Sequence, residues 1–318
     1  MTIRKAVIPA AGKGTRLYPL TKSQPKEMLP LGRKPTIQHV AEEVAASGCD
    51  RIVIVTGRNK RAIEDHFDRA QHSDNHPEHN GLYELYSRGV SFFYTRQAEP
   101  QGLGAAVLTA RGFTADEPFV VALGDVVMQG ALGQEPLLAR MVRTFAEREA
   151  VAVVAVREVA PETVSRYGIV CPATPVGACF RIGDLVEKPA PEAAPSNLAI
   201  TARYVFAPQI HDYLARTPQG LGGEVQLTDA IQLMAQEGLS VWGVRLEPGE
   251  RRHDVGDIGQ YIRAFLDVCL ADEELGAELQ AYVSGLACPA ALGEERQGVS
   301  QPPATTEKGG EATPPTTT

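Results

Sequence analysis

The chain has 318 residues, of which 43% are hydrophobic and 22% are charged, as is usual for a globular protein. The net charge of -8 argues against a nucleic-acid-binding surface. No apolar run approaches the ~20 residues that span a bilayer, and residues 1–5 lead into a strand without a signal-peptide core. We therefore expect a cytoplasmic protein, with one large α/β domain or two smaller ones, that binds neither nucleic acid nor membrane.

The first predicted strand, residues 6–8, runs into a loop with the sequence Ala-Gly-x-Gly-Thr-Arg. Gly12 and Gly14 let the backbone turn tightly and aim several N–H groups at one anion. Arg16 and Lys26 add permanent positive charge beside them. The loop lacks the third glycine of G-x-G-x-x-G and is not a Walker loop. The charges predict a polyphosphate ligand, although these residues alone also allow a plain turn between strand and helix.

Helices and strands alternate over the first half of the chain. Helical spacing of apolar residues covers 37–45, 60–67, a segment from 102 and 137–149, and apolar strands are predicted at 52–55, 90–95, 119–123 and 151–156. Continuous apolar strands are typical of a sheet that is buried on both faces. We therefore predict a Rossmann-like, doubly wound mixed sheet of α/β class, with ligands outside the carboxyl ends of the strands.

The second half is predicted to contain shorter strands, at 167–170, 185–186 and 204–206, that form a small β subdomain on the core. Helices are expected at 208–216, 228–237 and 257–286, with a strand at 240–246 between the last two. The segment 293–318 is rich in Pro, Thr, Glu and Gly, and we expect it to be disordered because it cannot offset its ordering entropy.

Cysteine and histidine residues give no strong metal or disulfide signal. The five cysteines are scattered without a C-x-x-C pair, which favours reduced thiols. His72, His76 and His79 stand in a polar segment that has no cysteine and no metal-binding scaffold of carboxylates. A solvated loop therefore explains these histidines better than a metal site.

Two aspartates follow predicted strands at the edge where the ligand is expected. Asp125 comes directly after the strand at 119–123, and Asp254 follows the strand at 240–246. Each could serve simply as a turn or helix cap. Together they could instead hold Mg²⁺, which is usually bound by one or two carboxylates and substrate phosphates.

The loop and the following Pro25-Lys26-Glu27-Met28-Leu29-Pro30 resemble the signature of the sugar-1-phosphate nucleotidylyltransferases, and most of all that of the bacterial UTP:glucose-1-phosphate uridylyltransferases. Leu-Gly-Asp at Asp125, His-Asp-Val-Gly-Asp at Asp254 and Glu187-Lys188-Pro189 fit the same family in the same order. The resemblance implies a nucleotidyltransferase domain at 1–292. Within it we expect a nucleotide-binding core at 1–150, a sugar-side region at 151–256 and C-terminal helices at 257–292, followed by the tail.

The resemblance also implies roles for individual residues. It makes Asp125 and Asp254 the Mg²⁺ ligands, and it makes Arg16, Lys26, Lys188 and Asp125 the catalytic residues. Of these, Lys188 would bind the attacking phosphate, and Arg16 and Lys26 would bind the triphosphate. The nucleotide would contact Ala10, Ala11, Gly12, Gly14, Thr15, Glu27, Gln97 and Gly102. The sugar would contact Gly168, Glu187, Lys188 and Asn197.

The reaction that follows from this resemblance is attack by the phosphate oxygen of glucose 1-phosphate on the α-phosphorus of UTP. Both reactants are anions, so positioning and charge neutralisation are the main tasks of the protein. A homo-oligomer, either dimer or tetramer, is expected as well. One departure is a segment between residues 67 and 90 that is shorter than in the usual uridylyltransferases of this type.

Three other functions fit part of the sequence. A thymidylyltransferase that uses dTTP needs nearly the same loop, because thymine differs from uracil by one methyl group. A glycosyltransferase could share the core, but no D-x-D follows the strand at 119–123. A non-catalytic sugar-nucleotide sensor would bind without turnover. It would have no need of five charged residues together, namely Arg16, Lys26, Asp125, Lys188 and Asp254.

Overall fold

The computed structural model describes residues 2–68, 81–131 and 133–286. The chain divides into two compact units, the first ending at Val268 and the second beginning at Cys269. Among the described residues, none of the helices has both the length and the apolar character needed to cross a membrane. The histidine-rich segment and the predicted disordered tail lie outside the described residues.

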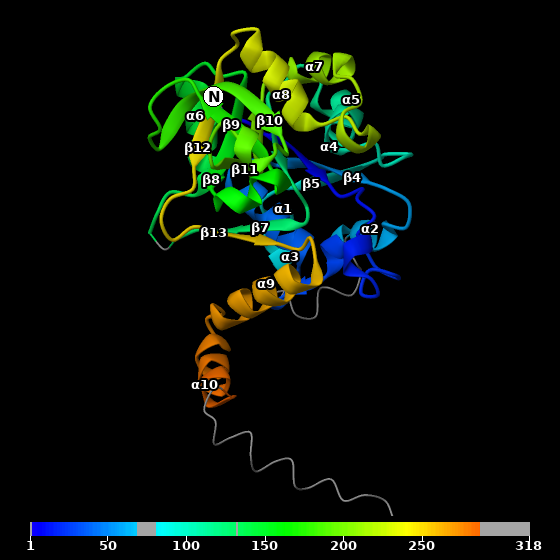
Figure 1. The fold of residues 1–318 in the computed structure, drawn as a ribbon. Coiled ribbons are helices and arrows are strands. Elements are labelled where there is room, and N and C mark those ends of the chain that lie inside the picture. The colour runs from blue at the N-terminus through cyan, green and yellow to red at the C-terminus, as the bar shows by residue number, and fades with distance from the viewer. Residues whose placement is uncertain (1, 69–80, 132, 287–318) are drawn as a thin grey trace, which may run out of the picture. The chain divides into compact units, whose positions relative to one another are not determined.

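A nine-stranded mixed sheet forms the centre of the first unit (Figure 1). Its strands are β1 (Lys5–Pro9), β4 (Arg51–Thr56), β5 (Ser91–Arg96), β6 (Phe119–Ala122), β8 (Ala152–Glu158), β9 (Gly168–Pro172), β10 (Cys179–Glu187), β11 (Leu198–Phe206) and β12 (Val241–Arg245). The strand order is β5-β4-β1-β6-β11-β8-β12-β10-β9. The predicted mixed sheet is therefore confirmed, and the strands of the sugar-side region continue the same sheet as the nucleotide-binding core.

Two short ribbons lie beside this sheet. One pairs β2 (Pro30–Leu31) with β3 (Lys34–Pro35), and the other pairs β7 (Val126–Gln129) antiparallel with β13 (Arg251–Asp254). The sequence analysis predicted neither β7 nor β13. Their pairing joins the segment after β6 to a segment far along the chain.

Helices of the first unit cover both faces of the sheet. They are α1 (Thr36–Ala46), α2 (Arg61–Phe67), α3 (Gly81–Ser87), α4 (Leu103–Thr109), α5 (Arg111–Thr114), α6 (Leu137–Glu147), α7 (Ile210–Arg216) and α8 (Leu227–Gln236). Two helices follow in the chain, α9 (Ile258–Leu270) and α10 (Gly276–Leu286), of which α10 belongs to the second unit. Single 3-10 turns occur at Thr15–Leu17, Lys26–Met28, Pro161–Arg166, Pro191–Ala193 and Leu221–Gly223.

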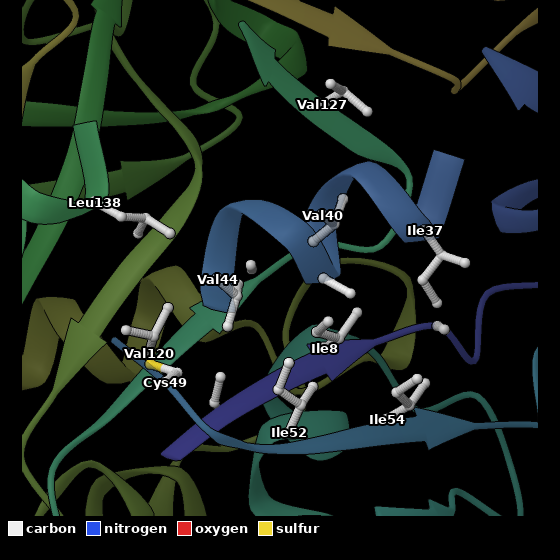
Figure 2. Packing of buried hydrophobic residues seen from close by; sticks show 14 of the residues in the cluster. Ile8, Ile37, Val40, Val44, Cys49, Ile52, Ile54, Val120, Val127 and Leu138 are labelled. Atoms are coloured by element: carbon white, nitrogen blue, oxygen red, sulfur yellow. The ribbon is translucent and has the colours of Figure 1, made fainter. Parts of the chain in front are cut away.

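Alternate residues of the strands face the two helical layers, because side chains along a strand point to opposite sides. On one face, Ile8 and Ile52 pack with Val40 and Val44 of α1, as Figure 2 shows. On the other face, the neighbouring Val7 and Val53 belong to a second core cluster, which includes residues of α4, α7 and α8. The apolar runs of β1 and β4 are therefore buried on both sides, as predicted.

The predicted helix at 257–286 is wrong in one respect, since two separate helices occupy this region. α9 ends at Leu270 and α10 begins at Gly276. Between them, the Asp272 carboxylate accepts hydrogen bonds from the backbone N–H groups of Glu274 and Leu275. Such local bonds compete with the helical ladder, which explains the break.

Candidate active site

The glycine loop after β1 lines a cavity of about 470 Å³ at the carboxyl edge of the sheet. The predicted residues that line it are Ala11, Gly12, Gly14, Thr15, Arg16, Lys26, Glu27, Gln97, Gly102 and Asp125. These residues come from the loop, the 3-10 turn at Lys26–Met28, the end of β5, the start of α4 and the end of β6. The structure thus brings most of the predicted nucleotide and phosphate residues together around one space.

The loop has the backbone conformation that its glycines permit. Gly14 has φ +67°, a left-handed value that favours glycine. The Gly14 carbonyl accepts a hydrogen bond of 2.8 Å from the Thr21 hydroxyl, which holds the turn. A Cβ atom at Gly12 would stand 3.5 Å from the Lys26 ammonium nitrogen, so the loop backbone lies directly beside this charge.

Lys26 and Asp125 form the charged centre of the cavity, with Nζ and Oδ2 2.5 Å apart. Burial alone would raise the pKa of Asp125, but attraction to Lys26 and the hydrogen bond from it hold the pKa below its usual value. Burial likewise opposes the charge on Lys26, but Asp125 and the neighbouring carboxylates Glu27 and Asp254 raise its pKa overall. Both side chains are therefore charged at neutral pH.

The ribbon of β7 and β13 brings Asp254 to Asp125. Asp254 pairs with Val126 across the ribbon, and the Val255 N–H donates a 3.0 Å hydrogen bond to the Asp125 carbonyl. No group of three or more His, Cys, Asp or Glu side chains suited to a metal occurs within the described ranges. Two carboxylates fit a cation such as Mg²⁺, which keeps waters and substrate phosphates as its other ligands.

Three of the predicted sugar residues form a second cluster on β9 and β10. Gly168 pairs with Glu187, and a Cβ atom at Gly168 would stand 3.1 Å from a Glu187 carboxylate oxygen. The Lys188 ammonium lies 3.0 Å from Glu187. Lys188 has φ +47°, an unusual value for a residue with a side chain, and such strain is common at functional sites.

The remaining predicted residues are less directly connected to these clusters. The exposed Asn197 lies two residues before Ala199, which pairs with Ile169. Ala10 is buried behind the loop, and its N–H donates a 2.9 Å hydrogen bond to the Val55 carbonyl. Neither Ala10 nor Asp254 belongs to the cavity lining.

Gln97 and Gly102 line the same cavity. The Gln97 amide donates a 3.4 Å hydrogen bond to the Gly102 carbonyl. Gly102 has φ +100°, and a Cβ atom there would stand 2.8 Å from the Cβ atom of Glu224. The segment before α8 therefore presses against the start of α4, and Glu224 itself lines the cavity.

Lys60 is a buried charged residue beside the site that was not predicted from the sequence. It is 6% exposed, and its ammonium lies 2.6 Å from the carboxylate of Glu27, which is 1% exposed. Burial raises the pKa of Glu27, and the two nearby lysines, Lys60 and Lys26, counteract this only in part. A lysine at the start of a predicted surface helix gave no signal of this buried ion pair.

Arg252 and Arg157 were missed as well. Arg252 donates a 2.7 Å hydrogen bond to Asp254, and Arg157 donates a 3.1 Å hydrogen bond to the Tyr167 hydroxyl. Both guanidinium groups also lie over the Tyr167 ring. Since Tyr167 precedes Gly168 directly, these side chains connect the two aspartates with the sugar-side cluster.

Comparisons with known proteins agree with this arrangement. The chain is 44% identical over 290 residues to a UTP--glucose-1-phosphate uridylyltransferase of Bacillus subtilis, covering 89% of this chain and 97% of the relative. A UDP-glucose pyrophosphorylase complexed with UDP-glucose has a TM-score of 0.77 and 38% identity, covering 83% of this chain and 97% of that chain. A UTP-bound enzyme of this kind from Acinetobacter baumannii has a TM-score of 0.79 and 34% identity, covering 89% and 99%.

The sequence profile of the nucleotidyl transferase family matches residues 5–270, which include the glycine loop, both aspartates and the sugar-side cluster. The family resemblance inferred from the sequence motifs is thereby confirmed. This chain belongs to the nucleotidyl transferase family.

Proposed function

We propose that the protein transfers a uridylyl group from UTP to α-D-glucose 1-phosphate, giving UDP-glucose and pyrophosphate. The observation that carries this proposal is the Lys26–Asp125 ion pair beside the glycine loop, in a cavity that Gln97 also lines. The names of the similar proteins support uridine as the nucleoside and glucose as the sugar.

The chemistry follows from the charges around the cavity. The sugar phosphate oxygen attacks the α-phosphorus in line, and pyrophosphate leaves. Gly12 and Gly14 offer backbone N–H groups to the triphosphate, and Arg16 and Lys26 neutralise the charge that develops on the leaving group. Lys188 holds the attacking phosphate. Because no covalent nucleophile is needed, the protein accelerates the reaction by aligning two anions and reducing their repulsion.

We propose Mg²⁺ as the cofactor, held by Asp125 and Asp254. When bound, it would supply positive charge to the triphosphate and orient it. The low pKa of Asp125 supports this role, because a metal ligand must be ionised. Arg252 keeps Asp254 in place through its hydrogen bond.

Base and sugar recognition are assigned to the two ends of the site. The Gln97 amide offers a donor and an acceptor to the uracil edge, with Ala10, Ala11, Thr15, Glu27 and Gly102 completing the nucleotide site. Glu187 accepts hydrogen bonds from sugar hydroxyls, next to Gly168, Lys188 and Asn197.

We also propose that the protein acts in the cytoplasm as a homo-oligomer, a dimer or tetramer. The apolar side chains Ile258, Ile262 and Leu266 are spaced four residues apart on α9 and are 40%, 51% and 45% exposed. An apolar stripe of this kind supports self-association.

The experiment that tests the proposed function is pyrophosphate release with glucose 1-phosphate and Mg²⁺, with UTP, dTTP, ATP, CTP and GTP compared in parallel. We expect release with UTP well above release with the others. A preference for dTTP would make the protein a thymidylyltransferase with the same mechanism. Binding of UDP-glucose without release from any nucleotide would make it a sensor.

A further inference from the structure

A second cavity, of about 620 Å³, adjoins the nucleotide cavity. The two cavities share residues of the glycine loop, among them Ala11, Gly12 and Lys13, together with Gln97. The residues that line only the second cavity come mainly from the segments 18–25 and 57–62. The glycine loop therefore lies between the two cavities, and the proposed reaction takes place in the nucleotide cavity only.

The second cavity is strongly basic, although the whole chain has a net charge of -8. Its lining includes Lys13, Lys22, Arg58, Lys60 and Arg61, and none of the described residues that line it is an aspartate or glutamate. Within the described part of the chain, no carboxylate forms an ion pair with Lys13, Lys22 or Arg58. Like charges gathered without a counter-charge repel each other, so this arrangement favours a bound anion.

We propose that this cavity binds a phosphate-bearing anion with two or more phosphate groups, separately from the nucleotide site. Lys22 and Arg58 supply charge from opposite segments of the lining, and Arg58 can donate two parallel hydrogen bonds to one phosphate group. Ser23 and Asn59 line the same space and add neutral donors. A cavity of this size holds a pyrophosphate group or the polyphosphate end of a nucleotide.

Two contacts join this anion site to the nucleotide site. Lys60 lines the second cavity and Glu27 lines the first, and the Lys60 ammonium lies 2.6 Å from the Glu27 carboxylate. Gly57 packs against the loop so closely that a Cβ atom there would stand 3.1 Å from the Ala11 carbonyl oxygen. An anion that attracts Lys60 weakens its hold on Glu27, so occupancy of one cavity changes the affinity of the other.

Calorimetric titration of the full chain with inorganic pyrophosphate, in a buffer that contains Mg²⁺, tests this proposal. No turnover occurs, because no sugar nucleotide is present. For the free protein we expect two pyrophosphate ions per chain. After saturation with α,β-methylene-UTP, which fills the nucleotide site, we expect one. The double variant Lys22→Ala/Arg58→Ala should bind pyrophosphate at the second site at least tenfold more weakly, since it loses two charge-assisted contacts.

The matched control is Arg88→Ala/Arg143→Ala, which removes the same charge from exposed positions outside both cavities. It should keep the second site within twofold of its original affinity. One pyrophosphate per free chain, or equal weakening in both double variants, would overturn the proposal. Failure of α,β-methylene-UTP to bind would count against the proposed uridylyl transfer and not against this inference. The inference is then decided by the pyrophosphate titrations without nucleotide, in which the original chain should bind two ions and Lys22→Ala/Arg58→Ala should bind one of them at least tenfold more weakly.

Discussion

Asp125 is the residue whose charge the proposed chemistry most needs. Its substitution Asp125→Asn keeps the size of the side chain and removes the charge that pairs with Lys26. We expect a loss of turnover of at least roughly 100-fold, the order of magnitude for removing one preorganised electrostatic group. Pyrophosphate release at several Mg²⁺ concentrations measures the effect.

The control for this substitution is Asp116→Asn, at an exposed position before β6. It should retain the original activity. Circular dichroism should show the same fold in both variants. Undiminished turnover in Asp125→Asn would remove this residue from the proposed metal site.

His211 gives a prediction about pH and stability. It is 1% exposed, stacks on Phe119 and lies 2.7 Å from the Thr114 hydroxyl. Burial and then the nearby Arg111 lower its pKa from 6.5 to about 4. Between pH 6.5 and about 4, His211 is protonated in the unfolded chain but neutral in the folded chain. Its contribution to stability is therefore lost as the pH falls from about 6.5 to 4.

The size of that loss is about 3 kcal/mol over the whole window, from the pKa shift and 1.36 kcal/mol per unit. Urea unfolding at pH 7.5, 5.5 and 4.5 would measure it. In His211→Gln, which has no titrating ring, the decrease over this range should be smaller by about that amount. Equal pH dependence in both proteins would show that His211 is not buried in its neutral form.

At the level of single residues, the sequence predicted the site best where a motif fixes the chemistry. The loop residues Gly12, Gly14 and Arg16, with Lys26 and Asp125, all line one cavity. Side chains that act through other side chains, such as Lys60 and Arg252, were not predicted, because ion pairs between distant segments leave no periodic pattern in the sequence.

Among the elements, the start of α4 gives the sharpest test. A Cβ atom at Gly102 would stand 2.8 Å from both the Glu224 Cβ and the Val225 carbonyl oxygen, and its φ of +100° is strained for alanine. Gly102→Ala must therefore move the segment at Glu224 or the helix start, and both line the nucleotide cavity. We expect KM for UTP to rise several-fold, measured by initial rates.

Gly112→Ala in α5 is the comparison for that variant. Nothing lies within 4 Å of a Cβ atom at Gly112. Alanine there should leave KM unchanged and stabilise the protein by up to about 1 kcal/mol, the difference in helix propensity. A similar KM in the two variants would mean that the close approach at Gly102 does not shape the nucleotide site.

The elements themselves were predictable where they are long and apolar. β1, β4, β6 and α1 lie within a residue or two of their predicted ranges. β13 was missed because its sequence, Arg-Arg-His-Asp, has no apolar run. β7 was missed because Val-Val-Met-Gln follows the strand of β6 after only a short turn and does not stand out as a separate strand. Their pairing depends on tertiary contacts, and it is this pairing that brings Asp254 to Asp125.

At the scale of the whole first unit, Arg203 connects three elements. It is fully buried on β11, donates two hydrogen bonds to Glu43 on α1 and one of 2.8 Å to the Val126 carbonyl on β7. Arg203→Met leaves Glu43 without its partner, and breaking a buried pair in this way costs about 3–5 kcal/mol. Chemical unfolding would measure this loss.

Two further variants serve as controls for Arg203→Met. Arg203→Met/Glu43→Met removes both charges and should recover part of the stability. Arg111→Ala breaks an ion pair with Asp212 whose side chains are 54% and 68% exposed, and should cost under about 1 kcal/mol. A loss in Arg203→Met as small as that in Arg111→Ala would contradict a structural role for the buried pair.

The ribbon of β7 and β13 has a consequence for the order in which the protein becomes active. The glycine loop, Lys26 and Asp125 are all made early in synthesis, whereas Asp254 arrives with β13, near the end of the first unit. A nascent chain that stops before β13 lacks Asp254, one of the two proposed metal ligands, and also Gly256, which lines the nucleotide cavity. The nucleotide cavity and the proposed metal site are therefore both complete only when the end of the first unit has been synthesised.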